Sequence, residues 1–189
     1  MAKAKGTTLI SSVKFLRQHR DAARALLPEA LHRYLEERVI PTSWYPETDL
    51  LELIRATARL VPGAGADVFE TMGRITAREH LEGTYAHLVD GKGDPLSIPS
   101  RAFALWASQH DSGRITALLE GPDRVRIDVV DFAIPSREMC AVVGGYVVET
   151  LRLAGLPAPR GEKLCCRLDG ADRCSWRCVW VPAAASEVG

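Results

Sequence analysis

All five cysteines of the 189-residue chain lie in two segments, Met139-Cys-Ala-Val-Val-Gly-Gly-Tyr146 and Gly161-Glu-Lys-Leu-Cys-Cys-Arg-Leu-Asp-Gly-Ala-Asp-Arg-Cys-Ser-Trp-Arg-Cys-Val-Trp180. No thiol precedes them, so the cysteines are gathered for one local purpose. In a reducing compartment, clustered cysteines more often serve metal or redox chemistry than structural disulfides. These two segments therefore decide both the expected fold and the expected site.

The second segment is predicted to be a β-hairpin. Asp169-Gly170 is a turn signal between two strand-like runs, which would bring Cys166 close to Cys174. Because strand residues alternate between faces, one face of the second strand carries sulfur and indole side chains. These side chains are Cys174, Trp176, Cys178 and Trp180. Cys140, on a helix expected over 136–154, would pack over that face, and three thiolates plus one further donor make a closed tetrahedral zinc site.

The spacing Cys140-x4-Gly145-Tyr146-x19-Cys166-x7-Cys174 resembles the C-terminal signature of the 4-vinyl-reductase domain. The resemblance implies a fold related to the small TRAPP tethering subunits and a habit of forming homodimers. Members of this family that form the sensor halves of phenol-responsive activators hold a structural zinc with the three matching cysteines and a glutamate, beside an apolar pocket for aromatic ligands. The resemblance implies the same arrangement here. Trp44-Tyr45-Pro46, with Lys5-Gly6-Thr7, is similar to an uncharacterised family expanded in myxobacteria.

The fourth zinc ligand is the point at which the chain departs from that pattern. The family's glutamate falls at Lys163, one residue from the carboxylate of Glu162. Four candidates remain, namely Glu162, Cys165, Cys178 and His110. Glu162 shares strand parity with Cys166, whereas Cys165 points away unless the strand bulges. We therefore predict a structural zinc on Cys140, Cys166, Cys174 and Glu162.

The order of helices, hairpin, helix and hairpin predicts an α+β fold with a four-stranded, mainly antiparallel sheet covered by helices. We expect a single domain over 1–189, with a helical layer at 1–95, a sheet-containing core at 96–181 and a flexible tail at 182–189. Gly144-Gly145 in mid-helix costs about 1 kcal/mol each relative to alanine. Such a cost suggests close packing, either onto the sheet or against a twin helix.

An aromatic stripe runs along the helix expected after Ile98. Phe103, Trp106 and His110 recur at helical spacing, which is typical of an ordinary hydrophobic core. The same stripe also suits a ligand pocket in which His110 or Trp106 supplies a polar contact. We expect the pocket residues to be Phe103, Trp106, His110, Tyr146 and Trp176. His80 and His87 lie seven residues apart, but no third ligand of fitting spacing accompanies them.

Charge and hydropathy exclude several classes of function. Lys+Arg and Asp+Glu balance at 24 each, so no basic excess recruits nucleic acid, and no apolar run suggests a membrane span or a signal peptide. We therefore expect a cytoplasmic small-molecule-binding or sensory domain that is not an enzyme and takes an apolar or aromatic molecule. A homodimer and a protein partner for output are also expected. The alternatives are a TRAPP-like scaffold, a tetrapyrrole vinyl reductase and a thiol redox switch.

Overall fold

The computed structural model of the chain describes residues 1–88 and 95–181. Its first half contains β1 (Lys3–Lys5), α1 (Gly6–Gln18), α2 (Arg20–Leu26), η1 (Glu29–Leu31), α3 (Arg33–Glu36), β2 (Trp44–Pro46), α4 (Glu47–Leu60), α5 (Val68–Leu81) and η2 (Ala86–Leu88). The second half contains η3 (Pro95–Ser97), α6 (Ile98–Gln109), β3 (Arg114–Gly121), β4 (Arg124–Val130), α7 (Arg137–Leu153), β5 (Arg160–Cys165), η4 (Arg167–Asp169) and β6 (Cys174–Val179). The tail expected at 182–189 lies outside the described residues.

The main sheet has four antiparallel strands in the order β3-β4-β6-β5. The predicted α+β class is thus confirmed, with N-terminal helices and a four-stranded antiparallel sheet packed on helices. Three cross-strand pairs, Val129–Cys174, Ile127–Trp176 and Val125–Cys178, place side chains that are all buried on one face of the sheet. The sulfur and indole face expected from the alternation is this buried face.

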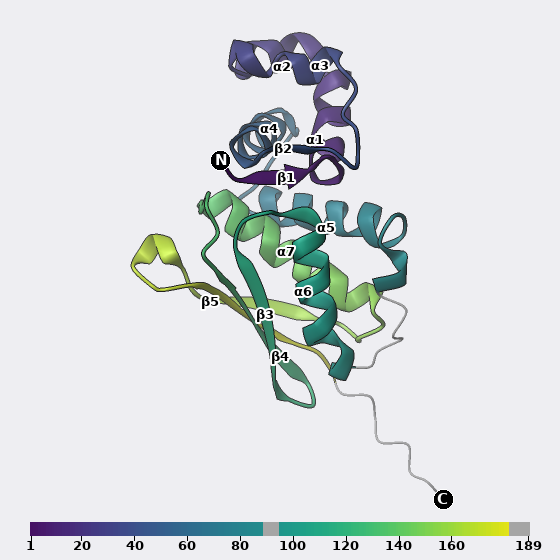
Figure 1. Cartoon of the computed structure of the whole chain (residues 1–189), viewed down its shortest axis with the longest axis vertical. Helices are drawn as coiled ribbons and strands as arrows, with labels where there is room; N and C mark the ends of the chain where they lie inside the picture. Colours follow the sequence, from purple (N-terminus) through teal and green to yellow (C-terminus); the bar gives the residue numbers. More distant parts are fainter. Residues whose placement is uncertain (89–94, 182–189) are drawn as a thin grey trace, which may run out of the picture.

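The helices fall into two groups around the sheet (Figure 1). Helices α1 to α4 stack at one end with the small β1–β2 sheet, and the four-stranded sheet occupies the other end. Helices α5 and α7 lie between these two parts, and α6 runs alongside the strands of the sheet. In the part of the chain that the structure describes, every helix is too short or too polar to cross a membrane.

Two glycines allow α5 and α7 to pack closely. A Cβ atom on Gly73 of α5 would lie 2.0 Å from the carbonyl oxygen of Val142, and one on Gly145 of α7 would lie 2.0 Å from that of Glu70. Gly144 faces the sheet instead, where an added Cβ would meet Trp176 Nε1 at 3.1 Å. Gly144 therefore packs onto the sheet, as one of the two expectations had it, whereas Gly145 packs against α5 of the same chain.

The strands β1 and β2 were not predicted, and they bring distant segments together. Ala4 forms a bridge with His110, and the backbone N–H of Asp111 donates to the carbonyl of Lys3 at 3.0 Å. The N–H of Glu47, at the start of α4, donates to the carbonyl of Ala2 at 3.0 Å. The N-terminal strand thereby places Glu47 next to His110, which are 63 positions apart in the chain.

Candidate functional site

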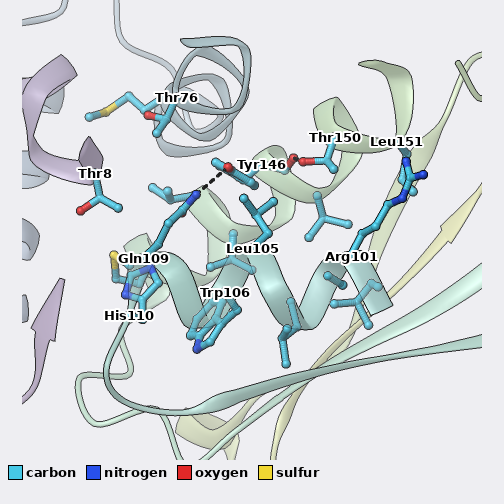
Figure 2. Close-up of a pocket in the computed structure, with 18 of the residues that line it drawn as sticks. Thr8, Thr76, Arg101, Leu105, Trp106, Gln109, His110, Tyr146, Thr150 and Leu151 are labelled. Atoms are coloured by element: carbon cyan, nitrogen blue, oxygen red, sulfur yellow. Dashed lines mark hydrogen bonds between the residues drawn. The ribbon is translucent and has the colours of Figure 1, made fainter. Parts of the chain in front are cut away.

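A cavity of about 130 Å³ lies among α5, α6, α7 and the inner face of the sheet. Its lining is mainly apolar and comes from segments spread along the whole chain, including Ile54, Met72, Leu105, Ile115, Ile127 and Val143. A few polar side chains also reach it, including Thr8, Thr76 and Thr150 (Figure 2). An apolar cavity with a few convergent polar groups is the usual form of a small-molecule site.

A buried hydrogen-bond network closes one side of the cavity. Gln109 Nε2 donates to the hydroxyl of Tyr146 at 2.9 Å, the contact drawn in Figure 2, and lies 3.0 Å from His80 Nδ1. His80 Nε2 lies 3.1 Å from the carbonyl oxygen of Thr7, so this nitrogen carries the proton and Nδ1 accepts. Burial lowers the pKa of His80 and raises the pKa of Tyr146. Both groups are therefore neutral, and the network rigidifies this wall.

A second buried imidazole, His110, has a different environment. Its Nδ1 lies 3.0 Å from Glu47 Oε1, and Ser112 Oγ donates to Glu47 Oε2 at 2.9 Å. The ring stacks on the indole of Trp106 with centroids 4.5 Å apart and an interplanar angle of 27°. Among the described residues His110 Nε2 has no hydrogen-bond partner. His110 lines the cavity, so its ring is one of the polar groups that a ligand there could contact.

The structure gathers three of the five expected pocket residues around the cavity. Trp106, His110 and Tyr146 line it. Phe103 does not, because its side chain is on the outer face of α6 and is 56% exposed. Trp176 lies against a separate void of about 20 Å³ beside the cysteines. Sequence reasoning missed Gln109, whose only signal was its place one turn of helix after Trp106 on the buried side of α6.

The three cysteines of the predicted metal site form a compact cluster. The Sγ atoms lie 3.7 Å apart for Cys140 and Cys166, 3.6 Å for Cys140 and Cys174, and 3.8 Å for Cys166 and Cys174. A tetrahedral zinc with Zn–S bonds of about 2.3 Å has its sulfur atoms about 3.8 Å apart. The cluster therefore has the spacing of three corners of a tetrahedron and could hold a metal ion.

The thiols of the cluster differ in the direction in which their pKa values are shifted. Burial raises the pKa of Cys140 to about 12, although the nearby charge of Lys163 opposes the shift. The pKa of Cys166 is lowered: burial raises it, but hydrogen bonds from the backbone of Leu168 and from the thiols of Cys140 and Cys174 outweigh burial. The backbone N–H of Arg167 also points at Cys174 Sγ, 3.5 Å away. Metal binding to this cluster would release protons, so its affinity rises with pH.

The structure does not bring the predicted fourth ligand to the cluster. Glu162 is exposed and pairs in register with Arg177 on β6. Cys165 Sγ donates instead to the carbonyl of Arg173, and the pKa of Cys178 is raised to about 12 by burial. His110 contacts Glu47. Among the described residues, the cluster that could hold a metal contains Cys140, Cys166 and Cys174 alone.

The fold and these two sites define an α+β domain with an apolar cavity and a thiol cluster. No protein-family model matches the chain, and no curated protein matches it. Solved structures of H-NOX domains do match its fold. An oxygen-binding H-NOX domain related to soluble guanylate cyclases, in its oxygen complex, is 13% identical, with a TM-score of 0.66 and 98% of this chain and 100% of that chain covered.

Two further matches give the same picture. An H-NOX protein from S. oneidensis in the Fe(II)NO ligation state is 14% identical, with a TM-score of 0.66 and coverage of 94% of this chain and 99% of that one. An H-NOX structure from work on heme distortion in that family is 14% identical, with a TM-score of 0.66 and coverage of 98% and 100%. The chain therefore has an H-NOX-like fold over nearly its whole length.

The resemblance to the 4-vinyl-reductase domain, the TRAPP subunits and the myxobacterial family is therefore wrong. The structural neighbours are H-NOX domains at high coverage. The physical reason for the error is that the cysteine spacing depends only on one helix and one hairpin, whose thiols lie close together. A local arrangement of that kind does not fix the identity of the domain around it.

Proposed function

We propose that this chain is a small-molecule-binding domain of H-NOX-like fold whose cavity takes a compact, mainly apolar molecule. The observation that carries the proposal is the apolar cavity of about 130 Å³ that lies between the helices and the sheet. An engineered apolar cavity of about 150 Å³ binds benzene or xenon. The cavity here is close to that size, and in addition it offers His110 as a polar contact. Its ligand is therefore of the size of a single substituted ring.

The residues around the cavity do not fit a heme. A porphyrin macrocycle is several times larger than benzene, whereas the cavity holds about 130 Å³. His80 uses both ring nitrogens in hydrogen bonds. His110 lines this cavity, so a porphyrin bound at its ring would have to displace the packed walls. The heme and gas chemistry of the H-NOX neighbours is therefore not proposed for this chain.

Ligand binding is tested by thermal unfolding in the presence of toluene. We expect saturating toluene to raise the melting temperature, because a ligand that binds only the folded state stabilises it. Ala102→Leu, which fills the cavity, should abolish this shift, whereas Ala104→Leu on the exposed face of the same helix should preserve it. Equal shifts in both variants would show that the cavity is not the site and would favour the scaffold alternative.

A separate titration with hemin tests the size argument. We expect no stoichiometric complex and no shifted Soret band, because the ring would have to displace the packed walls of the cavity. A one-to-one hemin complex that Ala102→Leu abolishes would show instead that the cavity opens far enough to take a porphyrin.

We also propose that the thiol cluster holds a zinc ion with a structural role. The cluster joins Cys140 near the start of α7 to Cys166 and Cys174 at the ends of the β5–β6 connection. When bound, zinc would supply a cross-link between helix and hairpin rather than reactivity. Mass spectrometry of metal content in reduced, untagged protein tests this proposal, with about one zinc per chain expected. A fully reduced, folded protein that stays metal-free in excess zinc would refute it.

A further inference from the structure

Among the described residues, the ammonium nitrogen of Lys163 is buried beside the thiol cluster and has no nitrogen or oxygen acceptor. The thiol of Cys140 is its hydrogen-bonding neighbour. Lys163 lies on β5 in register with Trp176 of β6, and its Nζ sits 3.3 Å from the centroid of the Trp176 indole ring. Its positive charge acts on the thiols of Cys140 and Cys166. A buried, unpaired ammonium is unfavourable, so a negative charge or an acceptor is expected next to it.

The charge of a metal-loaded cluster supplies that partner. A divalent ion bound by three thiolates carries one net negative charge, which the single positive charge of Lys163 balances. Lys163 therefore neutralises the charge that three thiolates leave on a divalent ion.

The fourth corner of the tetrahedron also lacks a protein donor. In residues 1–88 and 95–181, no other histidine, cysteine, aspartate or glutamate joins Cys140, Cys166 and Cys174. Zinc sites that keep an open position fill it with water or another exogenous donor. An oxygen, nitrogen or sulfur donor in that position, next to Lys163, would accept a hydrogen bond from Nζ.

We infer that the site binds its metal through Cys140, Cys166 and Cys174 and leaves the fourth position to an exogenous donor, solvent-derived or a compact anion, held by Lys163 Nζ. The inference rests on the proposed metal site and adds that one of the four coordination positions is open to an exogenous ligand. A zinc closed by four protein ligands is inert toward small ligands, whereas this site exchanges its fourth ligand. Lys163 is a positioning residue for that ligand.

Cobalt substitution tests the inference with azide as the probe. Co²⁺ bound by thiolates is coloured, and its visible bands respond to a change of the fourth ligand. We expect azide to shift these bands in the wild-type protein. Lys163→Met should bind azide at least about tenfold more weakly, because a charge-assisted hydrogen bond is lost. Lys163→Arg, which keeps the charge and donors, should retain most of the response.

The outcomes separate this inference from the metal site on which it rests. If Co²⁺ binds but saturating azide leaves the bands unchanged, the fourth ligand comes from the protein and the inference is wrong. Repeating the titration with Glu162→Gln would then show whether that carboxylate is the ligand. If reduced protein binds no Co²⁺, the proposed metal site itself fails. If Lys163→Met does not fold, the azide response of the wild-type and Lys163→Arg proteins still decides the question.

Discussion

The cavity and the thiol cluster are built in opposite ways. The cluster draws its three ligands from a stretch in which Cys140 and Cys174 are 34 positions apart. The cavity draws its walls from residues as distant as Thr8 and Thr150. The cluster is therefore visible as a spacing of reactive residues, whereas the cavity is visible only after the chain has folded. A cluster of reactive residues can be recognised from their spacing in the sequence, whereas a cavity lined by distant residues cannot.

The two sites nevertheless share a wall. Trp106, Met139 and Val143 line both the cavity and the smaller void of about 20 Å³ that adjoins Cys140 and Cys174. Helix α7 carries Cys140 at one end and Tyr146 farther along, so both sites depend on the position of one helix. The following changes separate the two sites or show how closely they are coupled.

The largest effect is expected from Cys174→Ser. Loss of one of three thiolates should release the metal and lower the free energy of unfolding by at least about 4 kcal/mol, because metal binding stabilises the folded state. For a chain of this length the melting temperature should fall by about 10 °C. Metal analysis and thermal unfolding measure both effects. Cys165→Ser is the control and should change stability by less than about 1 kcal/mol, because Cys165 is not in the cluster.

Gly145→Ala should disturb the cavity while leaving the cluster intact. The new Cβ would lie 2.0 Å from the carbonyl oxygen of Glu70, which forces α5 away from α7 and costs about 3 kcal/mol. Toluene binding should weaken while metal content stays near one per chain. Gly144→Ala meets Trp176 at 3.1 Å and gains helix propensity, so urea denaturation should show a smaller change. Equal losses in the two variants would contradict the α5–α7 packing.

Leu105→Ala should enlarge the cavity without affecting the metal. Leucine-to-alanine changes in a core cost about 2–5 kcal/mol, and a value near 2 is expected because Leu105 already borders a void. Calorimetry should then detect binding of a larger ring such as naphthalene, which the wild-type cavity excludes. Unchanged ligand selection would show that Leu105 does not limit the size of the site.

The smallest effect concerns pH. Burial lowers the pKa of His80, so the unfolded chain binds a proton on this residue more readily than the folded protein does. The stability contributed by the neutral ring is complete above the unfolded value of about 6.5 and falls below it, by at most about 1.4 kcal/mol per pH unit. Urea denaturation at pH 7.5 and pH 5.5 should show a smaller difference for His80→Gln than for the wild type. The exposed His19→Gln is the control.

The strand and helix pattern was predictable where apolar periodicity was strong. The alternation of apolar residues predicts a hairpin with strands at 115–120 and 124–132, and β3, β4 and the helix α7 begin and end within a few residues of their expected positions. Strands β1 and β2 were not predicted, because a segment of three residues is too short to show the alternation of apolar and polar residues that indicates a strand. The apolar spacing predicts one long helix over 67–89, but α5 ends at Leu81, where a turn containing Gly83 follows. Residue 89 lies outside the described residues.

The sequence by itself determined the α+β fold class, the buried face of β6 and the grouping of Cys140, Cys166 and Cys174 as a candidate metal site. These features follow from residue spacing, because periodicity and turn chemistry act over a few residues. Only the tertiary structure decided that Glu162 lies away from the thiols, that Lys163 lies beside them, and that His110 meets Glu47 at a cavity. Those contacts join residues of no fixed spacing, because long-range packing places them.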